Sequence, residues 1–328
     1  MSFFAAFIHR QFIYEPPVPK ASFQGQTVIV TGASSGLGLE ACRWLVRLGA
    51  SQVILACRNV EKAKVAAADI QATTACSSGT LEVWELDMSS YASVHSFADR
   101  VKAALPRVDV LIANAGVGTT KFRQTEDNEE TITTNVVSMS LLAFLLIPRL
   151  RETAERYNTQ THLTVTGSEL YEVAKFKERK APTGQLFATL NDKSKSNMFD
   201  RYNVSKLLAL FVTKQLAGLS PLDSSGFGVI VNCVAPGFCH SELHREHNSS
   251  AARLAIKILA RPTEVGARTL VHGASVGPES HGQYLPDCKI TPTAGLTKGE
   301  TGAELQNRFW VELKQKLDAI RPGVTSLS

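Results

Sequence analysis

A tyrosine and a lysine stand four positions apart in the segment "DRYNVSKLL", at the head of an apolar run. In a helix these two residues, Tyr202 and Lys206, share one face, with Cβ atoms about 5–6 Å apart. A free phenol has a pKa of about 10, which is too high for ready proton exchange at neutral pH. Because a nearby ammonium favours the phenolate, the spacing predicts a tyrosine with a lowered pKa that acts as a general acid or base. The alternative is a packed tyrosine beside a lysine that reaches water.

A second group of residues has the composition of a phosphate-binding loop. The segment "TGASSGLG" follows a β-branched apolar run at 27–31 and precedes a helical pattern at 36–48. Glycines there permit a tight turn and close backbone approach to a phosphate, and the next helix begins with unpaired N–H groups. A glycine-rich turn with a purely structural role is the alternative. The position between a strand and a helix predicts a bound dinucleotide, with these contacts: Gly32, Ser34, Ser35, Gly36, Leu37 and Gly38.

The end of the second predicted strand bears on the type of dinucleotide. A carboxylate there would bind the ribose hydroxyls of NAD, whereas an arginine would pair with the 2′-phosphate of NADP. This chain has "LACRN", with Cys57 and Arg58 and no acidic residue. We therefore predict NADP(H) as the cofactor, with Arg58 as a contact. A surface arginine without this role is the alternative.

Strands and helices must alternate to position these residues, and the sequence has that pattern. Apolar runs at 27–31, 52–57, 81–86, 108–114, 162–167 and 227–234 alternate with helical patterns at 36–48, 60–70, 92–105, 131–156 and around Tyr202. Such alternation predicts right-handed crossovers and a parallel sheet. The predicted fold class is α/β, a single doubly wound Rossmann domain over residues 25–328, with about seven parallel strands and helices on both faces.

Three further segments stand outside this alternation. Residues 1–24 are expected to be a lead-in segment. Irregular stretches at about 170–200 and 237–262 each follow the carboxyl end of a strand. Since ligands of open α/β sheets bind beyond those ends, we expect both stretches to form a substrate pocket.

Composition excludes several classes of protein. The chain has 328 residues, a net charge of +5 and 44% hydrophobic residues, which is ordinary for a soluble domain with a large core. The densest basic stretch, 174–180, has too few positive charges for a nucleic-acid arm, so we expect no nucleic-acid partner. The longest apolar run, 136–147, is shorter than the roughly 20 residues of a membrane span, so we expect no integral span.

Cysteines and the N-terminus bear on location. The six cysteines contain no C-x-x-C pair, which favours free thiols in a reducing compartment. The start, "MSFFAAFIHRQF", has a six-residue apolar patch but no charged leader, which argues against a signal peptide. We therefore expect a cytoplasmic protein, whose N-terminal patch could contact a membrane surface or a partner.

Further motifs make the chain resemble the short-chain dehydrogenase/reductase family. The resemblance runs from about Gln26 to beyond Gly237 and rests on the order of "TGASSGLG", "LDMSS", "NAG", "YNVSK" and "PGFCHS". Three segments, "LACRN", "YNVSKLL" and "ELQNRFWVELKQKL", resemble those of the retinol-dehydrogenase-like branch, and within it those of fungal members of natural-product pathways.

The resemblance implies a role for each matching residue. Tyr202 is the implied acid and base, and Lys206 also holds the nicotinamide ribose. Ser168, after the fifth strand, would donate to the substrate oxygen. Asn135, an amide in an apolar helix, would anchor a water that relays protons to the lysine, with a satisfied core asparagine as the alternative. The other implied cofactor contacts are Asp87, Met88, Asn114, Ala115, Gly116, Pro236, Gly237 and Ser241.

Two departures from the family pattern surround Ser168. The family has two serines where this chain has Gly167 and Ser168, and Glu169 follows. A carboxylate there could recognise a basic or hydroxylated substrate or could face solvent. The interval from Ser168 to Tyr202 is also long. It could cover the helical surface that forms tetramers in the family, so we expect a monomer or homodimer.

Three histidines offer a rival site. His240, His244 and His247 have the i, i+4, i+7 spacing of metal ligands on one helical face. They follow Pro236 and Gly237 in an irregular stretch, however, and the implied reaction needs no metal. We predict no metal site and expect these histidines to face solvent or substrate.

These features together predict NADPH-dependent reduction of a ketone or aldehyde, reversible as alcohol oxidation, on a small apolar organic molecule of the kind found in secondary metabolism. Two alternatives stay open. One is an enzyme of the same fold that couples reduction to non-redox chemistry such as cyclisation, or replaces it. The other is a non-catalytic NADP-binding regulator.

Overall fold

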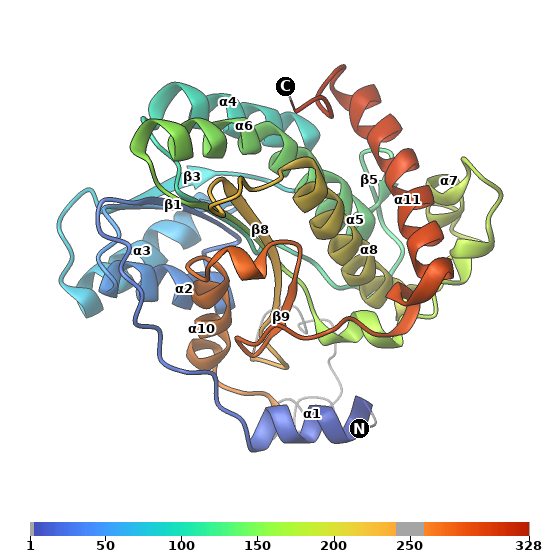
Figure 1. The fold of residues 1–328 in the computed structure, drawn as a ribbon, viewed down its shortest axis with the longest axis horizontal. Helices are drawn as coiled ribbons and strands as arrows, with labels where there is room; N and C mark the ends of the chain where they lie inside the picture. Colours follow the sequence, from blue (N-terminus) through green and yellow to red (C-terminus); the bar gives the residue numbers. More distant parts are fainter. Residues whose placement is uncertain (1–2, 241–258, 328) are drawn as a thin grey trace.

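A parallel sheet forms the centre of the structure (Figure 1). The computed structural model describes residues 3–240 and 259–327. Within them, seven strands pair in the order β3-β2-β1-β4-β7-β8-β9, and every pairing is parallel. The strands are β1 (Thr27–Thr31), β2 (Gln52–Cys57), β3 (Leu81–Glu85), β4 (Val110–Ala113), β7 (Thr161–Thr166), β8 (Val229–Ala235) and β9 (Tyr284–Pro286), with a separate antiparallel pair, β5 (Gln124–Thr125) and β6 (Asn128–Glu129).

Helices cover both faces of this sheet, because its strands are apolar on both sides. Strand β1 is buried along its whole length, with Ile29 in one core cluster and Val28 and Val30 in the other. Figure 1 shows α4, α6 and α8 on one face and α2, α3 and α10 on the opposite face. The helices and helical turns are α1 (Phe3–Phe12), α2 (Gly36–Arg47), α3 (Val60–Thr74), α4 (Tyr91–Ala104), α5 (Glu130–Ile132), η1 (Thr133–Ser138), α6 (Met139–Tyr157), η2 (Glu169–Val173), η3 (Lys177–Lys180), α7 (Leu186–Leu190), α8 (Met198–Leu219), α10 (Thr263–Gly273), η5 (Pro278–Ser280), η6 (Gly295–Thr297) and α11 (Gly299–Ile320).

The strand order creates the place where a ligand binds. The chain runs from β1 outward through β2 and β3, then returns to the other side of β1 with β4. Neighbouring crossovers therefore leave in opposite directions at β1 and β4, which opens a crevice beyond their carboxyl ends. The predicted α/β class, with a parallel sheet of about seven strands, is confirmed.

Two details differ from the sequence-based expectation. The seventh strand, β9, is only three residues long and was not located from the sequence, because a run this short has no readable period. The helix predicted at 131–156 contains a π-helical segment, η1, between α5 and α6.

Among the described residues, one helical stretch, 130–157, is both long enough and apolar enough to cross a membrane. Its mean hydropathy is 1.7, but 94% of its apolar window is buried inside the structure. This stretch is therefore a core helix, which packs against α4 and β7.

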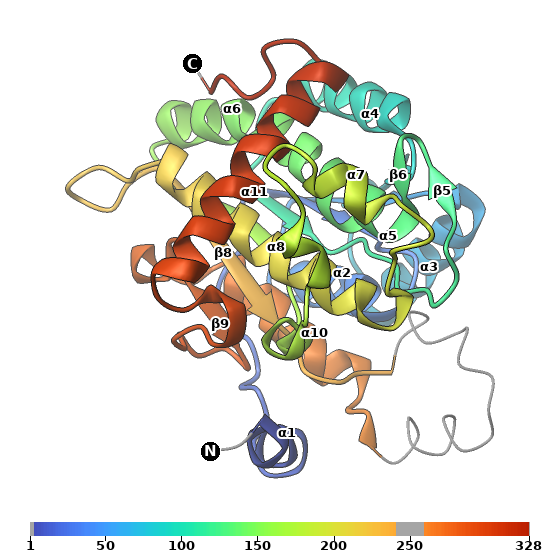
Figure 2. The same cartoon turned by 90° about the vertical axis from the view of Figure 1, so that its right-hand side faces the viewer.

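The stretch predicted as an irregular insertion, about 170–200, is folded and contributes to the core. It forms η2, η3 and α7, and it buries Tyr171, Phe176, Leu186 and Leu190. Figure 2 shows α11 lying across α8, near α7. There the ring of Phe309 contacts those of Phe211 and Phe187, with centroids 6.3 and 6.1 Å apart.

A fully buried arginine, Arg201, fixes this insertion to the start of α8. Its guanidinium lies 3.5 Å from Glu129 and 3.2 Å from Glu178. It also donates to the carbonyl of Leu190 at 2.9 Å and to the hydroxyl of Ser196 at 3.0 Å. Four chain segments therefore meet at one side chain, directly before Tyr202.

Removing this guanidinium should destabilise the protein strongly. In Arg201→Met, two buried carboxylates lose their partner, and we expect the free energy of unfolding to fall by about 3–5 kcal/mol. Lys64→Met is the control, because Lys64 and Glu61 form an exposed pair at 2.7 Å that should contribute less than about 1 kcal/mol. Urea unfolding followed by circular dichroism measures both changes. Equal losses in the two variants would contradict the structural role of Arg201.

Candidate active site

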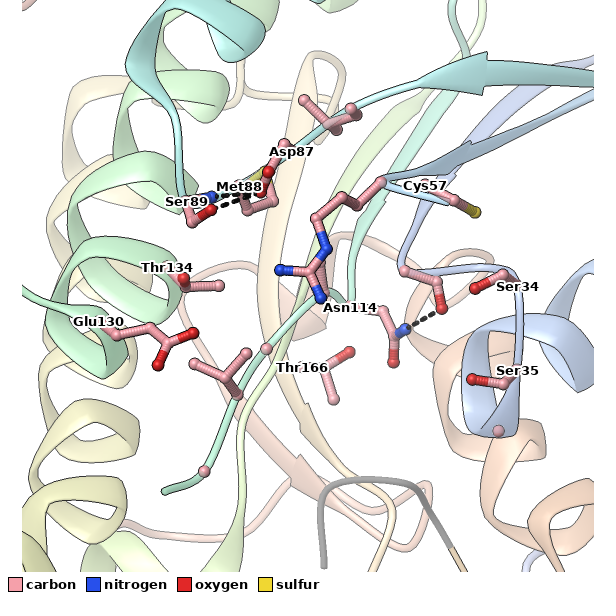
Figure 3. Close-up of a pocket in the computed structure, with 18 of the residues that line it drawn as sticks. Ser34, Ser35, Cys57, Asp87, Met88, Ser89, Asn114, Glu130, Thr134 and Thr166 are labelled. Atoms are coloured by element: carbon pink, nitrogen blue, oxygen red, sulfur yellow. Dashed lines mark hydrogen bonds between the residues drawn. The ribbon is translucent and has the colours of Figure 1, made fainter. Parts of the chain in front are cut away.

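A cleft of about 380 Å³ lies at the carboxyl ends of the central strands (Figure 3). It collects residues that are far apart in the sequence, from the segments after β1, β3 and β4, from the ends of β2 and β7, and from α8. Of the residues predicted from the sequence, those that line it are Gly32, Ser34, Ser35, Gly36, Leu37, Arg58, Asp87, Met88, Asn114, Ala115, Gly116, Tyr202 and Lys206.

The glycines of the first loop are required by backbone geometry. Gly32 and Gly36 have φ angles of +67° and +60°, which disfavour other residues. A Cβ on Gly32 would stand 2.9 Å from the Cα of Ala115, and one on Gly38 would stand 2.5 Å from the carbonyl oxygen of Gly32. Gly38 does not line the cleft; it lets α2 begin directly beneath the loop. Ser35, the N-cap, makes no side-chain capping bond, so the first-turn N–H groups are available to an anion.

The loop after β4 is fixed on β1 by a single threonine. The Thr31 hydroxyl accepts hydrogen bonds from the backbone N–H groups of Asn114 and Ala115, both at 2.9 Å. In return the Asn114 side chain donates to the Thr31 carbonyl at 2.9 Å. The two loops that form the floor of the cleft are therefore held as one unit.

The end of β2 carries the residues that bear on cofactor type. Cys57 is buried, and burial raises the pKa of its thiol, which hydrogen-bonds to the loop at Ala33 and Ser34. Arg58 is exposed, and no side-chain hydrogen bond or ion pair joins it to the residues that the structure describes. Lys62, in the first turn of α3, also lines the cleft. Lys62 was not predicted from the sequence. Its position four residues after Arg58, as a second cation near the end of β2, could have indicated it.

Asp87 lies at the opposite wall, after β3. Its carboxylate accepts from the N–H of Ser89 at 2.9 Å and from the Ser89 hydroxyl at 2.7 Å (Figure 3). Met88 beside it is buried. These bonds fix the orientation of the carboxylate at the rim of the cleft.

Tyr202 and Lys206 share one face of α8, as their spacing predicts. The Nζ atom of Lys206 lies 5.5 Å from the centre of the Tyr202 ring and donates to the carbonyl of Thr166 at 2.7 Å. Lys206 is buried, and this burial lowers the pKa of its ammonium to about 8. Thr166, the last residue of β7, also lines the cleft. The sequence did not predict the role of Thr166, because every residue has a backbone carbonyl and the residue type therefore gives no indication of it.

The predicted lowering of the tyrosine pKa is not what the structure gives. Burial raises the pKa of the Tyr202 phenol above its ordinary value, and a side-chain hydrogen bond with Ser168 lowers it only in part. Loss of hydration is the largest cause of the shift, and the neighbouring ammonium does not bring the pKa of this phenol down to its ordinary value. At neutral pH the phenol keeps its proton and can donate it.

Ser168 and Asn135 flank this pair. Ser168 is the N-cap of η2, and its hydroxyl accepts from the N–H of Leu170 at 3.3 Å. Asn135 lies within the π-helical segment, where its amide oxygen accepts from the N–H of Val117 at 2.8 Å. Its amide nitrogen donates to the Val117 carbonyl at 2.8 Å and to the Ser205 hydroxyl at 3.0 Å. The side chain is thus a satisfied core asparagine, the alternative that the sequence left open.

The segment after β8 lies outside the cleft lining. Pro236 and Gly237 contact Arg261, whose guanidinium carbon would lie 2.9 Å from a Cβ on Gly237. His240 is exposed. The predicted contact Ser241 and the histidines His244 and His247 lie outside the described residues. Among residues 3–240 and 259–327, no group of three or more histidine, cysteine, aspartate or glutamate side chains could hold a metal ion.

Comparison with known proteins identifies the family. Residues 26–156 match the family model described as short chain dehydrogenase. Over 322 residues the chain is 47% identical to the "Short chain dehydrogenase/reductase dmxR8" of Cryptosporiopsis sp., covering 98% of this chain and 99% of that protein. The chain belongs to the short-chain dehydrogenase/reductase family. The family predicted from the sequence is confirmed, whereas the retinol-dehydrogenase-like branch stays a prediction.

A second relative agrees with this assignment, and two solved structures share the fold. The "Short-chain dehydrogenase anuD" of Penicillium roqueforti is 39% identical, over 97% of this chain and 84% of that one. The RhlG/NADP active-site complex of Pseudomonas aeruginosa has a TM-score of 0.59 at 22% identity and covers 81% of this chain and 95% of its own. The oxidoreductase yciK from E. coli has the same TM-score at 21% identity, over 82% and 98%. These two structures share the fold of this short-chain dehydrogenase.

The buried ammonium of Lys206 predicts a specific pH dependence of stability. Its folded pKa of about 8 lies below the ordinary 10.5, so the unfolded chain binds more protons between these values. The free energy of unfolding of the wild type, relative to Lys206→Met, should therefore rise as the pH increases through this window. Urea titrations at several pH values measure the difference, with the exposed Lys64→Met as the matched substitution. A difference that stays constant or falls would contradict the burial of a charged ammonium.

Proposed function

We propose that this protein reduces the carbonyl group of a ketone or aldehyde with NADPH, and that it catalyses the reverse alcohol oxidation. The observation that carries the proposal is that Tyr202 and Lys206 line the same cleft as the glycine loop, while Ser168 hydrogen-bonds to the Tyr202 phenol. A phenol that keeps its proton, an ammonium 5.5 Å from the ring and a serine hydroxyl are the groups that carbonyl reduction needs.

The residues of the cleft fit NADPH. The uncapped N-terminus of α2 suits the pyrophosphate, and the approach of Gly32 to Ala115 leaves the backbone open to it. Arg58 and Lys62 supply positive charge where the 2′-phosphate would lie. Lys206, whose ammonium bonds to Thr166, has further donors for the nicotinamide ribose. When bound, NADPH supplies the hydride. NADP complexes of structures with the same fold, such as that of RhlG, support this choice.

Proton transfer falls to Tyr202. Its raised pKa keeps the phenol protonated, so that it donates to the carbonyl oxygen as negative charge develops there. Ser168, hydrogen-bonded to the phenol, is placed to donate to the same oxygen. Lys206 then stabilises the phenolate that Tyr202 becomes.

Asn135 links the loop after β4 to the helix that carries Tyr202 and Lys206. Its amide joins Val117 on the loop after β4 to Ser205, the neighbour of Lys206. A Cβ on Gly116 would stand 3.2 Å from its oxygen and 3.8 Å from Nζ of Lys206, so the three are closely packed. Because both polar atoms of this side chain are engaged with protein groups, we propose that Asn135 holds the loop after β4 against α8.

The substrate class is proposed from the relatives and from the sequence resemblance. The relatives come from fungi, and the sequence resembles members from natural-product pathways. We propose a small apolar intermediate of secondary metabolism. NADPH carrying deuterium at C4 tests the redox assignment, because only hydride transfer places the label in the product. A labelled cofactor that is consumed without label in the product would overturn it.

Removing the phenolic hydroxyl should abolish turnover without abolishing cofactor binding. For Tyr202→Phe we expect kcat to fall by about 10³-fold, within the range of general acid–base catalysis. NADPH affinity, measured by fluorescence titration, should change by less than about twofold, or 0.4 kcal/mol. Tyr157→Phe, at an exposed tyrosine on α6, is the matched control. Retention of full turnover in Tyr202→Phe would overturn the proposed mechanism.

Arg58 should decide the preference for NADPH over NADH. Loss of a charge-assisted contact of about 1.5–3 kcal/mol predicts that Arg58→Ala weakens NADPH binding about ten- to hundredfold. Binding of NADH, which lacks the 2′-phosphate, should stay the same. Arg156→Ala, at another exposed arginine, controls for the change in net charge. An equal loss for both cofactors would contradict recognition of the 2′-phosphate.

A further inference from the structure

The N-terminal helix α1 lies beside the site rather than apart from the fold. Figures 1 and 2 both place it below β9 and α10. Its neighbours are the residue after Ser168 and the loop after β8, which are the two segments next to the reacting end of the cleft. Three independent contacts define this placement.

The first contact is an ion pair with the glutamate that the sequence left unexplained. Glu169 does not face solvent: it is buried, and its carboxylate lies 3.2 Å from the guanidinium of Arg10. Burial raises the pKa of this carboxyl group, and Arg10 acts against that shift. The pair therefore joins α1 to the residue adjacent to Ser168. Without Arg10 the carboxylate would lose its ion-pair partner in a water-poor environment.

The second contact fixes Phe238, which follows Gly237. The Gln11 side chain donates to the Phe238 carbonyl at 2.7 Å. The rings of Phe7 and Phe238 have centroids 6.5 Å apart, within the range of an aromatic pair. Cys239, the next residue, is close enough to Tyr202 to raise the pKa of its phenol. The aromatic pair therefore belongs to the surroundings of the reacting end.

The third contact joins α1 to the segment that directly precedes α10. Arg261 donates to the Arg10 carbonyl at 2.5 Å and pairs with Asp287 at 2.5 Å. Beyond the helix, Arg268 holds Glu15 at 2.7 Å and the Pro16 carbonyl at 2.8 Å. Polar bonds thus hold the N-terminal arm at Arg10, Gln11, Glu15 and Pro16.

We propose that α1 is part of the substrate site: the Arg10–Glu169 pair positions Ser168, and Phe7 with Phe238 forms an apolar wall beside the substrate carbonyl. Arg10 is a positioning residue in this scheme, and the wall selects apolar, ring-containing carbonyl compounds. The proposal rests on the proposed reductase function and deepens it. It also gives the apolar N-terminal patch an intramolecular role.

The experiment uses the full chain and 1-tetralone, an apolar bicyclic ketone, as the probe. For Arg10→Met and Glu169→Gln we expect kcat/KM for NADPH-dependent reduction to fall at least about tenfold, while NADPH affinity changes less than about twofold. The reversed pair Arg10→Glu with Glu169→Arg should recover most of this loss. Arg107→Met is the matched control, since Arg107 is equally exposed, 22%, and pairs with Asp109 at the far end of β4.

Amide hydrogen exchange supplies a readout that needs no turnover. In Arg10→Met the backbone at 168–171 and 237–240 should exchange faster than in Arg107→Met. Equal exchange in the two variants would overturn the placement of α1, and faster exchange with unchanged kcat/KM would reduce it to a structural role. If the wild type binds NADPH but reduces no carbonyl compound, the proposed function fails. In that case the exchange data still decide whether Arg10 orders the segment around Ser168.

Discussion

The site depends on one buried ammonium. Lys206 loses most of its hydration on folding, which lowers its pKa to about 8, and the hydrogen bond to the Thr166 carbonyl offsets part of that loss. This bond joins α8 to the end of β7, so it sets the distance between the tyrosine and the cleft. The same dry surroundings raise the pKa of the Tyr202 phenol. A proton donor and a cation are thus held on one helix face, with Nζ of Lys206 5.5 Å from the centre of the Tyr202 ring.

Close backbone approach is the second constraint. The cleft exists because Gly32, Gly38 and Gly116 leave out a Cβ where neighbouring atoms stand within 2.5–3.2 Å of its position. Thr31 and Asn135 then hold the loops in place with hydrogen bonds to the backbone. These loops therefore present main-chain atoms to the cleft, which suits a ligand recognised by its phosphates and ribose hydroxyls.

Charged networks brace the catalytic helix and strand from two sides. On one side Asp200 accepts from the N–H groups of Lys175 and Phe176, both at 3.0 Å, and Arg201 ties the same insertion to α8. On the other side Glu169 is held by the N-terminal helix. Each network uses a residue directly next to a catalytic candidate, Tyr202 or Ser168. Because these residues are chain neighbours of Tyr202 and Ser168, the distant segments that hold them also help to fix the positions of the two candidates.

The sequence by itself determined the fold class, the family, the shared face of Tyr202 and Lys206 and the glycine loop, because each of these is written in a local period or spacing. Only the tertiary structure decided three features: the partner of Glu169, the position of the short strand β9 at the sheet edge, and the direction of the Tyr202 pKa shift. Residue spacing records which groups are neighbours along one helix. Burial, which raises the phenol pKa here, depends on every segment that packs around the side chain. It therefore cannot be predicted from one short stretch of sequence.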